Sequence, residues 1–168
     1  FASSGLCVVS PDPRTVYIAT GSPGARFFKS VDAGRSWSVE NTPFVRGNVA
    51  GLTGMAFKDT QRGIVVGANI DRLRNDTSES VVGITMDAGR TWTMRSRPPL
   101  PGALSGVAWV PGAGDEVAVV VGFGGAFVTP DAGRSWSVVG PQLYTGVAAA
   151  GRIAWIAGGN GRIVRLDW

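Results

Sequence analysis

An eight-residue motif occurs three times along this chain and limits the folds that the chain can adopt. The copies run from Ser30 to Trp37, from Thr85 to Trp92 and from Thr129 to Trp136. Each copy has the pattern Ser/Thr-x-Asp-x-Gly-x-Ser/Thr-Trp, and the three aspartates are separated by 55 and 44 residues. Repeats of this length are typical of architectures built from equivalent structural units, so a repeat protein is predicted.

Each motif lies between two short runs that favour β-strands, which predicts that the motif is the turn of a hairpin. The aspartate and the flanking hydroxyl groups can hydrogen-bond within the turn, and the glycine supplies the positive φ that a tight turn requires. The tryptophan is expected to begin the next strand and to bury on the order of 200 Å² against a neighbouring layer. The residues assigned this structural role are Ser30, Asp32, Gly34, Ser36, Trp37, Thr85, Asp87, Gly89, Thr91, Trp92, Thr129, Asp131, Gly133, Ser135 and Trp136.

A calcium-binding or catalytic role is the alternative for the three aspartates. A calcium loop offers several oxygen ligands at alternating positions, whereas each motif offers one carboxylate followed by Ala-Gly-Arg. An active site is also normally single and asymmetric, which disfavours three equivalent copies. Turn closure is therefore favoured, and no catalytic residue, metal site or cofactor is predicted.

Composition favours an all-β chain with tight turns, because it has 25 glycines, 10 prolines and no long segment of helical period. Histidine, the commonest general base and metal ligand, is absent, and Cys7 is the only cysteine, so no intrachain disulfide can form. Cys7 is expected in the core. The net charge of +4 comes partly from arginines that recur with the motif, so it does not indicate a clustered nucleic-acid surface. No apolar run is long enough to span a bilayer.

Alignment on the motifs predicts a partial β-propeller in a single domain, with three four-stranded blades and a three-stranded fourth blade. The expected blades cover about residues 5–40, 48–95, 104–139 and 144–168. Asp167 follows Gly158 by nine residues, as Asp131 follows Gly122, and is therefore expected at the position of a motif aspartate. The expected strands are 6–10, 15–20, 26–31, 36–40, 53–57, 63–67, 81–86, 91–94, 105–110, 116–121, 125–129, 135–139, 145–149 and 153–157.

A blade of three strands would leave an unpaired sheet edge, which invites pairing with another chain. Residues 1–4 are too short to supply the missing strand. We therefore expect a C-terminal part of a longer propeller, or a half-ring completed by a protein partner or by a second copy.

The motif resembles the Asp-box, or BNR repeat, which occurs once per blade in many propellers. The whole chain is similar to the C-terminal half of bacterial proteins of the photosystem II stability/assembly factor type. The segments that carry this resemblance are residues 1–5, 16–21, 51–57, 63–67 and 161–166. The resemblance implies a propeller of seven or a similar number of blades, exported to the periplasm or secreted by a bacterium, that acts as a rigid platform for protein contacts.

The largest feature that the repeat does not require is a long polar connection at residues 68–80. It is expected to open on the face opposite the Asp-box turns, and it predicts a non-enzymatic scaffold for protein-protein interaction or assembly. The candidate binding residues are Asp71, Arg72, Arg74 and Asp76 in this connection, with Arg46, Arg97 and Tyr144 on connections expected on the same face. For each residue alone, a solvated loop without a binding role is the simpler alternative.

Two alternative functions involve sugars. Whether the chain is an enzyme stays open, and a non-enzymatic function is preferred. A sialidase-like glycosidase would need a tyrosine nucleophile with a glutamate partner, and Tyr144 and Glu116 are the nearest candidates without a motif that links them. A carbohydrate-binding propeller could instead stack a sugar on Trp109 or Trp155. Both tryptophans lie in strand-like runs, so core packing is expected for them.

Overall fold

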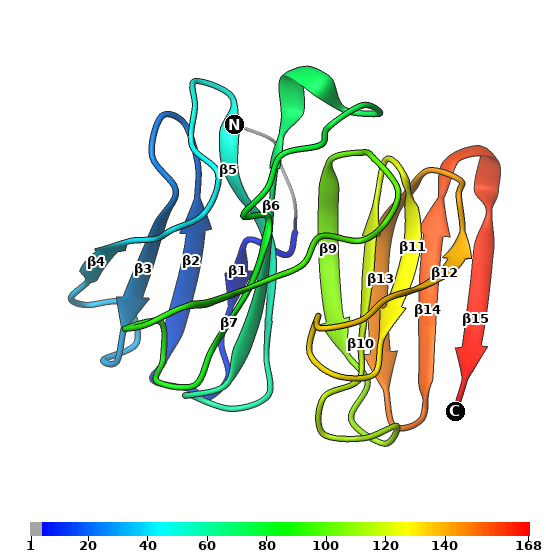
Figure 1. The fold of residues 1–168 in the computed structure, drawn as a ribbon. Coiled ribbons are helices and arrows are strands. Elements are labelled where there is room, and N and C mark those ends of the chain that lie inside the picture. Colours follow the sequence, from blue (N-terminus) through cyan, green and yellow to red (C-terminus); the bar gives the residue numbers. More distant parts are fainter. Residues whose placement is uncertain (1–4) are drawn as a thin grey trace.

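The computed structural model describes residues 5–168, which form four antiparallel sheets that follow one another in chain order (Figure 1). We call these sheets blades 1 to 4. Blade 1 contains β1 (Val8–Val9), β2 (Val16–Thr20), β3 (Arg26–Ser30) and β4 (Ser38–Asn41), and blade 2 contains β5 (Ala50–Phe57), β6 (Gly63–Asn69), β7 (Val82–Thr85) and β8 (Thr93–Arg95). Blade 3 contains β9 (Leu104–Trp109), β10 (Ala118–Gly122), β11 (Gly125–Thr129) and β12 (Ser137–Gly140), and blade 4 contains β13 (Tyr144–Ala150), β14 (Ile153–Gly158) and β15 (Ile163–Asp167). This arrangement confirms the predicted all-β, partial propeller fold.

The first strands of neighbouring blades lie against one another and mark the axis side of the molecule. Glycines permit this close approach, because a Cβ atom built on Gly54 would lie only 3.1 Å from the Cα atom of Gly106. The fourth strands β4, β8 and β12 lie at the opposite edge of their sheets. In blade 4 the third strand, β15, is the edge strand of the described sheet.

Several strand boundaries differ from those expected. The fourth strands begin after the motif tryptophan rather than before it, because the aspartate holds the turn together as far as the preceding serine or threonine. Strand β5 begins at Ala50, three residues earlier than expected, and β1 is reduced to Val8–Val9. Two short 3₁₀ turns, η1 (Ile70–Arg72) and η2 (Gly159–Gly161), lie in the connections between second and third strands.

The expected position of Asp167 is wrong by one residue. In blade 3 Val121 pairs with Ala126, whereas in blade 4 the equivalent Ala157 pairs with Ile163, because η2 makes the hairpin one residue longer. Asp167 therefore lies at the position of Pro130, one residue before the motif aspartate. Asp167 belongs to β15 and pairs across the sheet with Ile153.

Each pair of neighbouring blades encloses an apolar layer. Tyr17 and Phe27 pack with Leu52 between blades 1 and 2, and Ile64 and Val107 belong to the layer between blades 2 and 3. The layer between blades 3 and 4 contains Val119, Val121, Val147 and Ile156. The blades are thus held together by their faces, as the layered packing of sheets requires.

A bulge recurs in the first strand of blades 2, 3 and 4, where the register skips Thr53, Ser105 and Thr145 respectively. The Thr53 hydroxyl donates to the carbonyl oxygen of Leu104 at 2.7 Å, and the Ser105 hydroxyl donates to that of Tyr144 at 3.2 Å. Each hydroxyl therefore ties its blade to the first strand of the following blade.

Candidate functional site

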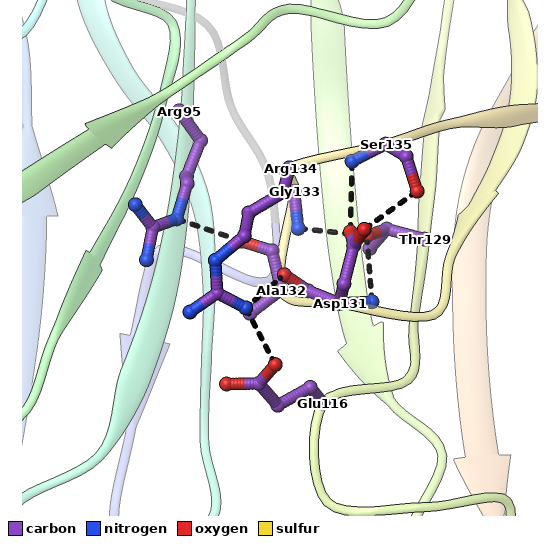
Figure 2. A network of polar contacts seen from close by, with 8 residues as sticks. All are labelled: Arg95, Glu116, Thr129, Asp131, Ala132, Gly133, Arg134 and Ser135. Atoms are coloured by element: carbon purple, nitrogen blue, oxygen red, sulfur yellow. Dashed lines mark hydrogen bonds and ion pairs between the residues drawn. The ribbon is translucent and has the colours of Figure 1, made fainter.

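The Asp-box of blade 3 shows how the motif closes its turn (Figure 2). The Asp131 carboxylate accepts hydrogen bonds from the Thr129 hydroxyl at 2.9 Å and from the Ser135 amide and hydroxyl at 2.8 and 2.6 Å. The Gly133 amide donates to the Thr129 hydroxyl oxygen at 2.7 Å, with a glycine φ of +87°. The carboxylate and the two hydroxyl groups of the motif are thus used within the turn.

The other two boxes have the same hydrogen bonds around Asp32 and Asp87. The Ser135 hydroxyl, with other donors of the turn, lowers the pKa of Asp131 to about 2. The pKa of Asp32 is lowered chiefly by Ser36, and at Asp87 burial raises the pKa but is outweighed by hydrogen bonds from Thr91 and Thr85. Over residues 5–168, no three histidine, cysteine or acidic side chains gather as a metal site.

These lowered pKa values predict an acid-sensitive fold. A carboxylate whose pKa is lower in the folded state stabilises the fold above its unfolded pKa of about 4, and this contribution disappears as the pH falls through the folded value. We expect wild-type stability to fall between pH 4 and about 2, and the Asp131→Asn variant to show a shallower fall over the same range. Chemical unfolding at a series of pH values measures both slopes, and identical slopes would contradict this role of Asp131.

The boxes of blades 2 and 3 also dock on the preceding blade. The Trp136 indole N–H donates to the Ser96 carbonyl oxygen at 3.0 Å, and the Arg95 guanidinium donates to the carbonyl oxygen of Ala132 at 3.2 Å. The Trp92 ring lies 5.4 Å from Phe27 and 5.6 Å from Phe44 in edge-to-face contact. Trp37 differs, because it is 41% exposed and bonds to its own box through the Gly34 carbonyl, so the expectation that it is buried is wrong.

The long connection after β6 lies on the face opposite the boxes, which we call the loop face (Figure 1). Asp71, Arg72 and Arg74 are exposed there. Asp76 is buried, and its carboxylate accepts hydrogen bonds from the amides of Asn69 and Ser78, both at 2.9 Å. Asp76 therefore shapes the connection and is not available for contact with a partner.

The remaining candidates also divide into exposed and structural residues. Arg97 donates to the carbonyl oxygens of Ser78 and Asp76 at 2.9 and 2.8 Å and so holds the long connection in place. Tyr144 is buried at the start of β13, 3.3 Å from the Gln142 amide oxygen. Arg46 is exposed, although it donates to the Thr42 carbonyl oxygen at 2.6 Å. The loop face thus presents Arg46, Asp71, Arg72 and Arg74.

A hollow of about 710 Å³ lies on the axis side of the loop face, with Ile70 and Leu73 of the long connection in its wall. Its walls are mainly apolar, and besides Leu6 and Thr53 they include Ile70, Leu73, Ala103, Leu104, Phe123 and Val147 from the long connection and from blades 3 and 4. Leu73 is exposed between the two loop arginines. Sequence reasoning missed these residues, although Ile70 and Leu73 are the apolar positions of an otherwise polar loop.

A second hollow of about 600 Å³ lies at the box end of the first strands. There the Lys58 ammonium lies 4.2 Å from the centre of the Trp109 ring, and the Trp109 indole N–H donates to the Ala56 carbonyl oxygen at 3.1 Å. Burial lowers the pKa of Lys58. The other candidate for sugar stacking, Trp155, is 42% exposed on the outer face of blade 4, so its predicted core position is wrong.

Cys7 and Glu116 complete the residues named from the sequence. Cys7 is half-buried, and its thiol donates to the Thr53 carbonyl oxygen at 3.2 Å. Glu116 forms an exposed ion pair with Arg134 of the blade 3 box, with 2.6 Å between the Nη1 and Oε2 atoms (Figure 2). No helix in the described part of the chain is long and apolar enough to cross a membrane.

Comparison with known sequences gives one clear relative. No family model matches the chain. The chain is 31% identical over 140 residues to an oligoxyloglucan-reducing end-specific xyloglucanase of Emericella nidulans. The match covers 78% of this chain and only 17% of the relative, so the chain spans less than a fifth of that enzyme.

Comparison with solved structures identifies propellers. YCF48 bound to D1 peptide gives a TM-score of 0.66 at 15% identity, covering 98% of this chain and 52% of YCF48. An ancestral GH74 enzyme gives 0.64 at 11% identity, covering 96% of this chain and 25% of the enzyme. The computationally designed protein Ika4 gives 0.63 at 12% identity, covering 99% of this chain and 93% of the design. At these identities the comparison establishes the fold alone: the chain is structurally similar to part of YCF48 and of a GH74 propeller.

Proposed function

We propose that this chain is a non-enzymatic propeller scaffold that holds an extended segment of a partner protein on its loop face. The observation that carries the proposal is the apolar hollow, whose wall includes Ile70 and Leu73 from the one long connection of the described blades. Binding sites are typically concave and mainly apolar, with a few polar groups that orient the ligand. Here Arg72 and Arg74 flank Leu73 and can supply that orientation.

The chemistry of this surface favours a particular kind of partner segment. An apolar side chain would enter the hollow, and acidic neighbours would pair with the exposed Arg72 and Arg74, which flank the lining residue Leu73, or with Arg46 of the same face. The D1 peptide bound by YCF48 supports a peptide ligand for a propeller of this fold. A periplasmic or secreted location, which the resemblance implies, is part of the same proposal.

Selection from a phage-displayed peptide library, with the D1 peptide as a separate probe, tests the proposal. We expect the selected peptides to carry an apolar residue next to acidic residues. Their affinity should fall at least tenfold in a Leu73→Asp variant. The control is Met86→Asp, which places the same charge on an exposed apolar residue of the box face and should leave affinity unchanged. Equal binding by wild type and Leu73→Asp would overturn the proposal.

Xyloglucan hydrolysis is the second candidate, because the curated relative is a xyloglucanase. Glycosidases commonly use two carboxyl groups on either side of the scissile bond. The box aspartates are engaged in turn closure, Glu116 is paired with Arg134, and the Tyr144 of the sialidase-like alternative is buried. We expect no release of reducing ends from xyloglucan oligosaccharides, and turnover by the purified chain would favour the enzymatic function instead.

A further inference from the structure

The wall of the loop-face hollow is held together by backbone hydrogen bonds between three separate segments. Leu73 belongs to the long connection, Ala103 directly precedes β9, and Phe123 lies in the turn between β10 and β11. The Ala103 amide donates to the Leu73 carbonyl oxygen at 2.6 Å, and the Phe123 amide donates to the Ala103 carbonyl oxygen at 2.9 Å. The place of Leu73 in the wall is therefore coupled to blade 3.

The buried carboxylate of Asp76 closes the long connection on itself. It accepts hydrogen bonds from the amide of Asn69, at the end of β6, and from the amide of Ser78. Ile70 and Leu73, the two wall residues of the connection, lie inside the loop that this carboxylate closes. These bonds give the loop its shape, but they do not attach it to blade 3.

Arg97 joins this closed loop to the segment that leads into blade 3. It lies between β8 and β9, and its guanidinium donates to the carbonyl oxygens of Ser78 and Asp76 at 2.9 and 2.8 Å. The Gly102 amide donates to the same Asp76 oxygen at 2.7 Å. In the part of the chain that the structure describes, Arg97 forms no ion pair, so its donors serve carbonyl oxygens rather than a carboxylate.

The surroundings of Arg97 indicate a structural clamp rather than a ligand contact. Arg97 is half-buried and is not one of the residues that line the hollow. A guanidinium presents its donors in a rigid, planar fork, so it can hold two carbonyl oxygens in a fixed arrangement. A lysine ammonium at this position would keep the charge but would lack the fork. The shape of the donor group therefore matters here, in addition to its charge.

We propose that Arg97 is a positioning residue of the loop-face site, which fixes Ile70 and Leu73 in the wall of the hollow before a ligand arrives. This inference rests on the proposed function of the hollow, which is to bind a peptide segment with an apolar residue next to acidic ones. A preformed wall does not have to be ordered when the ligand binds, and this favours affinity. Loss of the clamp should therefore weaken binding, although Arg97 itself does not touch the ligand.

Limited trypsin digestion of the unliganded chain tests the positioning directly. The exposed Arg72 and Arg74 are trypsin sites within the connection, and the exposed Arg134 of the third box is a site elsewhere. We expect Arg97→Gln to be cut after Arg72 and Arg74 at least tenfold faster than the wild type, and Arg97→Lys to be cut faster as well. Cleavage after Arg134 should not change. The matched control Arg26→Gln removes the same charge at the loop-face end of β3 and should be cut at the wild-type rate.

Two outcomes of the digestion would overturn the inference. The first is cleavage after Arg72 and Arg74 at the same rate in the wild type and in Arg97→Gln. The second is faster cleavage after Arg134 as well, because general unfolding rather than release of the connection would then explain the result. Circular dichroism verifies that the variants are folded.

Peptide binding separates the positioning role from a direct contact. For a peptide selected on the wild type, we expect both Arg97 variants to bind at least fivefold more weakly, with a salt dependence as steep as that of the wild type. Arg72→Gln removes a charge that faces the ligand, so it should bind more weakly and show a shallower salt dependence. Wild-type affinity of Arg97→Lys, or a shallower salt dependence of Arg97→Gln, would overturn the inference. A wild-type chain that selects no peptide would contradict the proposed function instead, while the digestion would still decide whether Arg97 holds the connection in place.

Discussion

Replacement of Phe27 by alanine is expected to lower the free energy of unfolding by about 3–5 kcal/mol, a large part of the stability of a domain of this size. The Phe27 side chain is fully buried between blades 1 and 2. Its ring centre lies 5.1 Å from that of Tyr17, 5.4 Å from that of Trp92 and 6.0 Å from that of Phe57. The truncation leaves a cavity among rings that belong to two other strands, β2 and β5, and to a box turn.

The neighbouring Phe28 is the matched control for this prediction. It lies on the opposite face of β3, is only half-buried, and has the Arg26 guanidinium 5.7 Å from its ring centre. We expect Phe28→Ala to cost about 1 kcal/mol or less. Urea unfolding of the two variants beside the wild type measures both losses. Equal losses of stability in the two variants would contradict this, because they would mean that Phe28 is packed as tightly as Phe27.

Replacement of Gly89 by alanine is expected to destabilise the chain by roughly 2–5 kcal/mol. Gly89 has a φ of +81°, and an added Cβ atom would lie only 2.4 Å from a ring carbon of Phe27. The left-handed conformation costs a non-glycine residue about 1–2 kcal/mol, and overpacking adds about 1–3 kcal/mol. Thermal and urea unfolding of the variant measure the loss.

Gly34 is the equivalent glycine of the first box and separates the two costs. Its φ is +85°, but the nearest atom to an added Cβ is a Trp37 ring carbon at 3.7 Å, an ordinary contact. Gly34→Ala should therefore cost only the backbone term of about 1–2 kcal/mol. Equal losses of stability in Gly34→Ala and Gly89→Ala would contradict the prediction, because the contact between the second box and Phe27 of blade 1 would then add nothing to the cost.

The hairpins could be predicted from the sequence because their information is local. Ser or Thr, Asp and Gly lie within five positions of one another and close the turn among themselves, whatever surrounds them. Trp155 and Trp37 were not predictable in the same way. Their runs are as apolar as those of buried strands, but their burial depends on whether another blade faces them.

The strand register of blade 4 could not be predicted from the local sequence either. The prediction for Asp167 counted nine residues from Gly158, as in blade 3, and so assumed hairpins of equal length. The hairpin of blade 4 contains one more residue because of η2. At the loop face, the polarity of the long connection predicted exposure correctly for Asp71, Arg72 and Arg74. It failed for Asp76, because its carboxylate turns inward to the amides of Asn69 and Ser78.

The central proposal is that the apolar hollow of the loop face, with Leu73 and Phe123 in its wall, holds an extended segment of a partner protein. Hydroxyl-radical footprinting, read by mass spectrometry with and without a peptide selected on the wild-type chain, tests it residue by residue. We expect Leu73 and Phe123 to lose reactivity when the peptide is bound, while the exposed Met86 of the box face keeps its reactivity. Reactivity of Leu73 and Phe123 that is the same with and without the peptide would contradict the proposal.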